Sequence, residues 1–187
     1  MALTEVKSQL MSASEIDRTL VRLAHEILEK TKDLDQLAFI GIRRRGVPLA
    51  QRLSAKIEAL EKRKIPVGIL DINLYRDDLS TVGAKPQLNA TEIAFSVTGK
   101  EIILMDDVLY TGRTIRAALD ALFDQGRPSR VQLLVLIDRG HRELPIEARY
   151  VGRNVQTSDA EIIEVKFLEI DDMEKVLLCE RAAAPAA

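Results

Sequence analysis

Short apolar runs alternate along this chain with longer stretches in which apolar residues recur every three or four positions. The short runs are typical of strands buried on both faces, and the longer stretches have the spacing of amphipathic helices. This alternation predicts an α/β domain with a parallel sheet flanked by helices. The expected strands cover residues 37–42, 67–75, 101–108, 131–140 and 161–170, and the expected helices cover 14–30 (capped by Ser14), 47–62 and 114–126.

Length and composition limit the class of protein. With 187 residues the chain predicts one domain over 1–187, with residues 1–13 and 180–187 frayed. Its single cysteine, Cys179, excludes an internal disulfide and a cysteine metal cluster. We expect a cytoplasmic protein with no membrane partner, because no segment resembles a signal peptide or a membrane span. A net charge of −2 argues against a surface that attracts nucleic acid everywhere, although a local basic patch is compatible with it.

Two adjacent aspartates close one of the apolar runs, and a turn rich in hydroxyl groups follows them in the stretch DDVLYTGRT (106–114). In open α/β sheets, ligands bind beyond the carboxyl ends of the strands. Backbone amides at the start of the following helix favour a phosphate, and Thr111 and Thr114 add hydroxyl donors. Gly112 lets the backbone approach a ligand closely. The turn therefore predicts a phosphate cradle.

Asp106 and Asp107 have the wrong charge for that phosphate. Carboxylates suit sugar hydroxyls, or a magnesium ion that the hydroxyls share. A phosphate beside a cis-diol describes a ribose 5-phosphate, so we expect the aspartates to hold the ribose and the turn to hold its 5-phosphate. The loops RRRG (43–46) and DRGHRELP (138–145) follow other expected strands and bring polar residues to the same edge of the sheet.

These motifs resemble those of the PyrR family of type I phosphoribosyltransferases. IILMDDVLYTGRT (102–114) is similar to the motif that binds phosphoribosyl pyrophosphate (PRPP). GIRRRG (41–46), LYRDD (74–78) and DRGHRELP (138–145) accompany it in the order found in the family. The resemblance implies a type I phosphoribosyltransferase fold, in which a small hood and a flexible loop adjoin the parallel sheet.

The resemblance implies two activities. The first is the reaction of uracil with PRPP to give UMP and diphosphate, with magnesium (Mg2+) and without a side-chain nucleophile. The second is regulation of pyrimidine nucleotide biosynthesis by transcriptional attenuation, in which the protein binds the leader of pyr operon mRNA in response to UMP or UTP. We also expect a homodimer or a higher homo-oligomer.

The resemblance also assigns residues to the reaction. Catalysis would involve Asp106, Asp107, Arg45 and Arg76, with Arg76 opening the loop that closes over PRPP. Magnesium would be held through PRPP near the two aspartates, without a direct protein site. The PRPP site would comprise Arg44, Arg45, Gly46, Asp106, Asp107, Val108, Leu109, Tyr110, Thr111, Gly112, Arg113 and Thr114, and the base pocket would comprise Arg139, Gly140 and His141. Arg44 departs from the threonine that is more frequent in the family.

RNA binding would use one face of the first expected helix. Polar and charged side chains recur there at spacings of four, three and four, at Arg18, Arg22, His25 and Glu29, opposite the apolar stripe. The residues assigned to RNA are Arg18, Arg22, His25, Lys30 and Arg153. The same pattern also describes a solvated charged face with an i,i+4 pair between His25 and Glu29. Val21 and Glu147 depart from the threonine and arginine typical of the family.

Two other functions stay open from the sequence. One is a phosphoribosyltransferase for a purine or another base, with no RNA role, and the stretch 138–145 argues against it. The other is an RNA-binding regulator with a vestigial active site. The intact aspartate pair and the intact turn at 111–114 argue against that second alternative.

Overall fold

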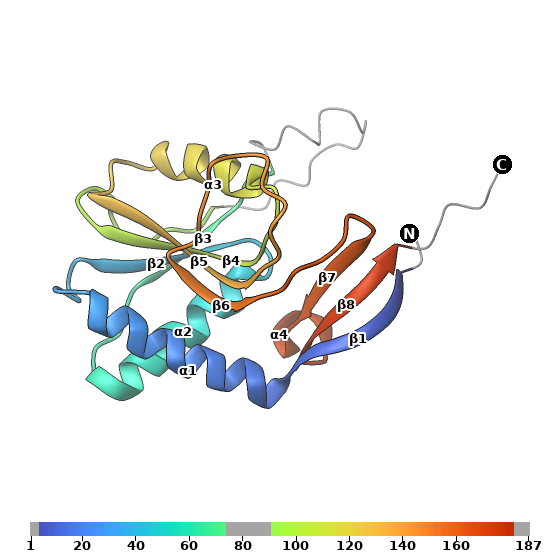
Figure 1. Cartoon of the computed structure of the whole chain (residues 1–187). Coiled ribbons are helices and arrows are strands. Elements are labelled where there is room, and N and C mark those ends of the chain that lie inside the picture. Colours follow the sequence, from blue (N-terminus) through green and yellow to red (C-terminus); the bar gives the residue numbers. More distant parts are fainter. Residues whose placement is uncertain (1–3, 74–90, 182–187) are drawn as a thin grey trace.

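The computed structural model describes residues 4–73 and 91–181, which form a five-stranded sheet and a three-stranded sheet (Figure 1). The five-stranded sheet is parallel, with the order β3-β2-β4-β5-β6, and the three-stranded sheet is antiparallel, with the order β1-β8-β7. The strands are β1 (Thr4–Ser12), β2 (Leu37–Ile42), β3 (Val67–Leu70), β4 (Glu101–Leu109), β5 (Arg130–Asp138), β6 (Tyr150–Asn154), β7 (Glu161–Lys166) and β8 (Lys175–Arg181). The helices are α1 (Ala13–Lys30), α2 (Gly46–Glu61), α3 (Arg113–Phe123) and α4 (Leu168–Asp171).

Helices cover both faces of the parallel sheet. One core cluster joins α1 and α2 to sheet residues such as Phe39, and a second joins α3 to residues such as Ile40 on the opposite face (Figure 1). All six residues of β2 are buried, because side chains of β2 point alternately into the two clusters. The predicted α/β fold with a flanked parallel sheet is confirmed.

The chain changes direction between β2 and β4, which are neighbours in the sheet. From β2 it passes through α2 to β3 at one edge, and from β4 it passes through α3 to β5 on the other side. Such a reversal separates the loops that leave the two strands and opens a crevice at their carboxyl ends. The loop 43–46 and the aspartate pair both lie at this point.

The three-stranded sheet is the hood, and it corrects the prediction for the two ends of the chain. Residues 4–13 and 180–181 are not frayed, because β1 pairs with β8 along its length and leads directly into α1. The stretch 161–170 is not one strand, since it divides into β7 and α4. Most side chains of β1 are exposed, so its pairing rests chiefly on backbone hydrogen bonds.

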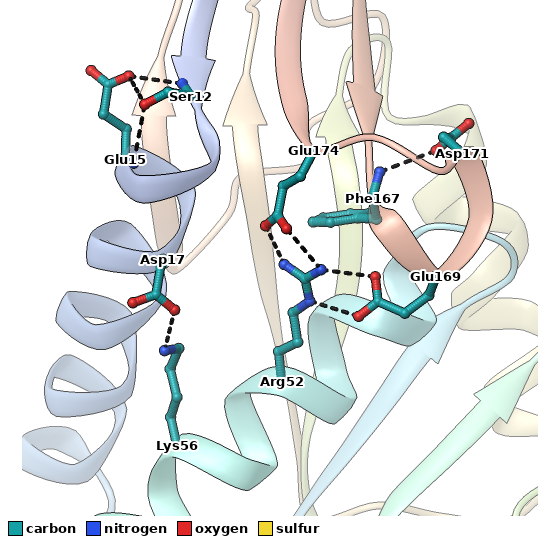
Figure 2. A network of polar contacts seen from close by, with 9 residues as sticks. All are labelled: Ser12, Glu15, Asp17, Arg52, Lys56, Phe167, Glu169, Asp171 and Glu174. Atoms are coloured by element: carbon teal, nitrogen blue, oxygen red, sulfur yellow. Dashed lines mark hydrogen bonds and ion pairs between the residues drawn. The ribbon is translucent and has the colours of Figure 1, made fainter.

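The helix α1 begins earlier than predicted. Its N-cap is Ser12 and not Ser14, because Ser12 and Glu15 form a capping box (Figure 2). The Ser12 hydroxyl accepts the backbone N–H of Glu15, and the Glu15 carboxylate accepts the backbone N–H of Ser12 at 2.8 Å. These two hydrogen bonds fix the junction between the hood strand β1 and the helix.

The strand β3 is shorter than predicted and ends at Leu70. The carboxylate of Asp71 accepts the backbone N–H of Asn73 at 2.9 Å, a local turn that replaces continued pairing. The remaining residues of that prediction, 74 and 75, lie outside the described residues. Among the residues that are described, no helix has the length and apolar character needed to cross a membrane.

Candidate active site

A cleft of about 370 Å3 lies at the carboxyl ends of β2, β3 and β4. It brings together six residues that the sequence assigned to PRPP. These are Arg44, Arg45, Asp106, Asp107, Val108 and Thr114. Ile42, Arg43, Asp71, Ile72 and Asn73 also line the cleft and were not anticipated. The position of Asp71 and Asn73 after a parallel strand is the signal that could have identified them.

Two glycines allow the loop 43–46 to lie against β4. A Cβ atom on Gly46 would stand 2.2 Å from the backbone oxygen of Met105, and one on Gly41 would stand 2.5 Å from the oxygen of Gly46. No side chain fits at these distances, so both positions require glycine. The close approach sets the arginines of the loop beside the aspartates. Gly46 is therefore buried, and it lets the arginine loop pack directly against β4.

The two aspartates are held by backbone groups. Asp106 is buried and accepts the backbone N–H of Asp107 at 2.9 Å, while half-buried Asp107 accepts the N–H of Val108 at 3.0 Å. Burial raises the pKa of the Asp107 carboxyl, and the neighbouring Asp106 and the Arg45 charge oppose this rise. The pair therefore presents oriented carboxylates with little need for reorganisation when a ligand arrives.

The donor set fits magnesium bound mainly through a substrate. Within residues 4–73 and 91–181, no group of three or more acidic, histidine or cysteine side chains could hold a metal alone. Asp106 and Asp107 would supply only part of the six oxygens that magnesium prefers, so phosphates and water would supply the rest.

Each arginine of the loop 43–46 has a different environment. Arg44 is exposed at the rim of the cleft. Arg43 forms an ion pair with Glu92 at 3.1 Å. Arg45 reaches the hood, where its guanidinium donates to both carboxylate oxygens of Asp171 at 2.7 and 3.3 Å.

The turn after β4 leads into α3 through a left-handed residue. Gly112 is the N-cap of α3 and has a φ of 92°, a conformation that favours glycine. The backbone N–H of Arg113 donates to the Thr111 hydroxyl at 3.3 Å, and the Arg113 side chain pairs with Glu143. Thr114 lines the cleft, which sets the first turn of α3 beside it. The N-terminus of an 11-residue helix suits an anion at this position.

The residues expected to form the base pocket gather beside the cleft and do not line it. The Arg139 guanidinium stacks 3.9 Å from the centre of the Tyr110 ring and donates to the Thr157 hydroxyl at 3.1 Å. A ring nitrogen of His141 lies 2.6 Å from the Thr157 backbone oxygen, and its ring meets Tyr110 edge-on. Gly140, with a φ of 76°, makes the bend between Arg139 and His141. Thr157 was not anticipated, because it lies 16 or more residues from its partners.

Six residues assigned to PRPP do not themselves line the cleft, namely Gly46, Leu109, Tyr110, Thr111, Gly112 and Arg113. Leu109 is buried in the core under α3, and its backbone oxygen accepts the N–H of Arg139. Its side chain therefore does not face the cleft, and its assignment to the PRPP site stays a prediction. Arg76 lies outside the described residues.

The residues assigned to RNA form an exposed surface on α1 and β6. Arg18, Arg22, His25, Lys30 and Arg153 are all exposed, and a shallow groove of about 340 Å3 lies between Arg18, Arg22 and Arg153. Arg22 donates to the backbone oxygens of Val151 and Gly152, at 3.0 and 2.7 Å. Glu26 pairs with both Arg22 and Lys30 and reduces the positive charge of the surface.

Comparison with known proteins decides the family. A model of the phosphoribosyl transferase domain matches residues 8–169. The bifunctional protein PyrR of Pelotomaculum thermopropionicum is 57% identical over 176 residues, which are 94% of this chain and 97% of that protein. The bifunctional protein PyrR of Thermus thermophilus is 56% identical over 178 residues, 95% and 98% of the two chains. The chain belongs to the PyrR family. The resemblance recognised from four motifs is confirmed.

Solved structures agree on the fold. The hypoxanthine-guanine phosphoribosyltransferase of Bacillus anthracis has a TM-score of 0.70 at 21% identity, over 92% of this chain and 98% of that chain. The hypoxanthine phosphoribosyltransferase of Trypanosoma cruzi has a TM-score of 0.73 at 18% identity, over 92% and 95%. At these identities the likeness shows the fold alone. The PyrR family member described here therefore has the type I phosphoribosyltransferase fold, as predicted.

Proposed function

We propose that this protein transfers the phosphoribosyl group of PRPP to uracil, giving UMP and diphosphate, and that it also regulates pyrimidine biosynthesis by binding pyr operon mRNA in response to uridine nucleotides. One observation carries the enzymatic part: an aspartate pair, an arginine loop and a helix N-terminus line one cleft at the reversal point of the sheet. Membership of the PyrR family supports both parts.

Each part of the cleft has a proposed role in binding PRPP. Asp106 and Asp107 accept the ribose hydroxyls, because carboxylates are acceptors for both groups of a cis-diol. The amides and hydroxyls of residues 110–114 donate to the 5-phosphate. Arg44 and Arg45 hold the diphosphate, since guanidinium groups bind phosphate oxygens through paired hydrogen bonds. Arg76 closes over the bound PRPP.

The reaction needs no nucleophile from the protein. The bond between the anomeric carbon and diphosphate breaks, and uracil N1 bonds to that carbon as its proton leaves. Positive charge develops on the ribose beside Asp107, and negative charge develops on the diphosphate beside Arg45, so fixed charges of opposite sign face both groups. Magnesium, when bound with PRPP, would neutralise the diphosphate near Asp106 and Asp107. Tyr110, Arg139, Gly140 and His141 border the space for the base.

A panel of bases tests the enzymatic part. The full chain is incubated with PRPP, magnesium and radiolabelled uracil, hypoxanthine or guanine, and the nucleotide products are separated. We expect labelled UMP with uracil and no purine nucleotide. Purine nucleotide without UMP would favour a purine enzyme, and the absence of any product would favour a vestigial site.

Salt dependence tests the RNA part. Arg18 is exposed on the groove surface, so its replacement in Arg18→Gln removes one cation without breaking a hydrogen bond or ion pair among the described residues. We expect the slope of log K against log salt for a pyr leader RNA to fall by about one, with UMP formation unchanged. Lys64→Gln, which removes an exposed cation between α2 and β3, is the control. An unchanged slope in Arg18→Gln would refute this face as the RNA surface.

Assembly and location complete the proposal. We place the protein in the cytoplasm as a homodimer or a higher homo-oligomer. Two copies of the α1–β6 surface in one assembly would bind RNA more tightly than a single copy, because the second contact becomes intramolecular.

A further inference from the structure

Two arginines at one side of α2 form ion pairs with the hood. Arg45 immediately precedes α2, and Arg52 lies roughly two helical turns further on, so both side chains leave on the same side. Arg52 donates to both carboxylate oxygens of Glu169 at 2.8 Å, and it also pairs with Glu174 (Figure 2). Arg45 pairs with Asp171. One short hood segment, 169–174, therefore supplies the carboxylates for both arginines.

Asp171 is itself firmly held. Its Oδ2 accepts the backbone N–H of Phe167 at 3.1 Å (Figure 2), and Lys166 lies 3.9 Å from its Oδ1. The carboxylate is only 12% exposed. Although burial opposes it, the hydrogen bonds from Arg45 and Phe167 lower the pKa of Asp171, so the group is an anion at neutral pH. Because the Asp171 carboxylate is held in place, its two hydrogen bonds set the orientation of the Arg45 guanidinium.

The held guanidinium borders the cleft. Arg45 lines the cleft together with Asp107, and its charge acts on the Asp107 carboxyl. A free arginine side chain would lose rotamer freedom on binding a ligand, whereas a side chain already held by Asp171 has lost it beforehand. The contact with Asp171 thus orients Arg45 before an anion binds, although Asp171 itself does not line the cleft.

We propose that Asp171 is a positioning residue, which holds the Arg45 guanidinium at the edge of the cleft in the orientation that binds the diphosphate group of PRPP. This inference rests on the proposed function for the identity of the ligand. Asp171 acts through Arg45 and touches no reacting atom. The hood therefore contributes to PRPP affinity through one carboxylate.

The test is Asp171→Asn in the full chain, with two readouts. Asn keeps an acceptor for the Phe167 N–H and loses the charge that holds Arg45. We expect the KM for PRPP and the Kd of magnesium diphosphate by calorimetry both to rise about tenfold, with a smaller fall in kcat because Arg45 also faces the diphosphate as it leaves. Asp171→Glu, which keeps a displaced carboxylate, should give intermediate values.

A double-mutant cycle with Arg45→Gln separates positioning from a general structural effect. In the Arg45→Gln background, Asp171→Asn should raise neither constant further, because its partner is already absent. Glu169→Gln changes the same segment without touching Arg45 and should leave both constants unchanged. Thermal unfolding checks that each variant is folded.

Three outcomes would overturn the inference. They are an unchanged or lower KM and Kd in both Asp171 variants, an equal further rise in the Arg45→Gln background, and the same rise in Glu169→Gln. If the wild-type protein binds diphosphate but makes no UMP, the proposed function fails, while the calorimetric comparison still decides the role of Asp171.

Discussion

Asp107 combines a half-buried carboxylate with a hydrogen bond from its neighbour in the strand. If this carboxylate holds the ribose of PRPP, its charge is needed when positive charge develops on the sugar. We expect Asp107→Asn to lower kcat/KM for UMP formation by at least about a hundredfold, since one preorganised charge is removed. Asn retains an acceptor for the Val108 N–H, so thermal unfolding should change little.

Asp120→Asn is the control for this prediction. Asp120 lies exposed on α3, where it pairs with Arg116 at 3.2 Å, and it does not line the cleft. A wild-type rate in Asp107→Asn, measured with the same labelled uracil assay, would refute the ribose role.

Single residues also show which parts of the site the sequence could predict. Asp106, Asp107 and Thr114 belong to one continuous motif, so their meeting was predicted from local order alone. The partner of Arg45, Asp171, lies 126 residues away, and no local pattern connects the two. Contacts of this kind depend on how the hood is placed against the sheet, and hydrophobic periodicity does not encode that placement.

At the scale of elements, the contact between α2 and the hood depends on Arg52 (Figure 2). The side chain is 21% exposed, stacks 5.0 Å from the centre of the Phe167 ring, and pairs with two carboxylates. We expect Arg52→Met to lower the free energy of unfolding by about 2–3 kcal/mol, because Glu174 would keep a largely buried charge without its partner. Urea unfolding followed by circular dichroism measures the change.

Lys56→Met is the matched control on the same helix. Lys56 pairs with Asp17 of α1, whose side chain is 64% exposed, so the pair contributes at most about 1 kcal/mol (Figure 2). Equal losses in the two variants would contradict the special role of Arg52.

The helices and strands also differ in how closely the sequence predicted them. β2, β4 and α3 were predicted closely, because β2 and β4 are continuous apolar runs and α3 has a clear buried stripe. β1, β6 and β8 were missed. β1 presents mainly exposed polar side chains, β6 is a short edge strand, and β8 runs into the end that was expected to fray. β1 forms only with β8, far along the chain, and such pairing leaves no local period.

For the whole molecule, the stability of the hood should depend on pH. The Lys7 ammonium donates to Glu161 at 2.8 Å, and this bond and the Ser158 N–H lower the pKa of Glu161 from 4.5 to about 2. A carboxyl with a lowered pKa in the folded state binds its proton more readily when unfolded. Its contribution is therefore complete above pH 4.5 and is lost as the pH falls toward 2.

We therefore expect Glu161→Gln to lower the melting temperature at pH 6 and to lower it less at pH 3. Thermal unfolding of wild type and variant across this range measures the difference between them. Glu5→Gln, an exposed glutamate of the same sheet, is the control. A gap between wild type and Glu161→Gln that stays constant from pH 6 to pH 3 would contradict the role of this carboxylate.

The pairing of β1 with β8 has a consequence for biosynthesis. Thr4 pairs with Arg181 and Ser12 with Lys175, so β1 leaves the ribosome long before its partner has been translated. The parallel sheet can assemble on the nascent chain in the meantime, but the hood closes only after β8 has emerged from the exit tunnel. Asp171 follows every strand of the parallel sheet in the chain, so Arg45 acquires its anchor only after those strands have been translated.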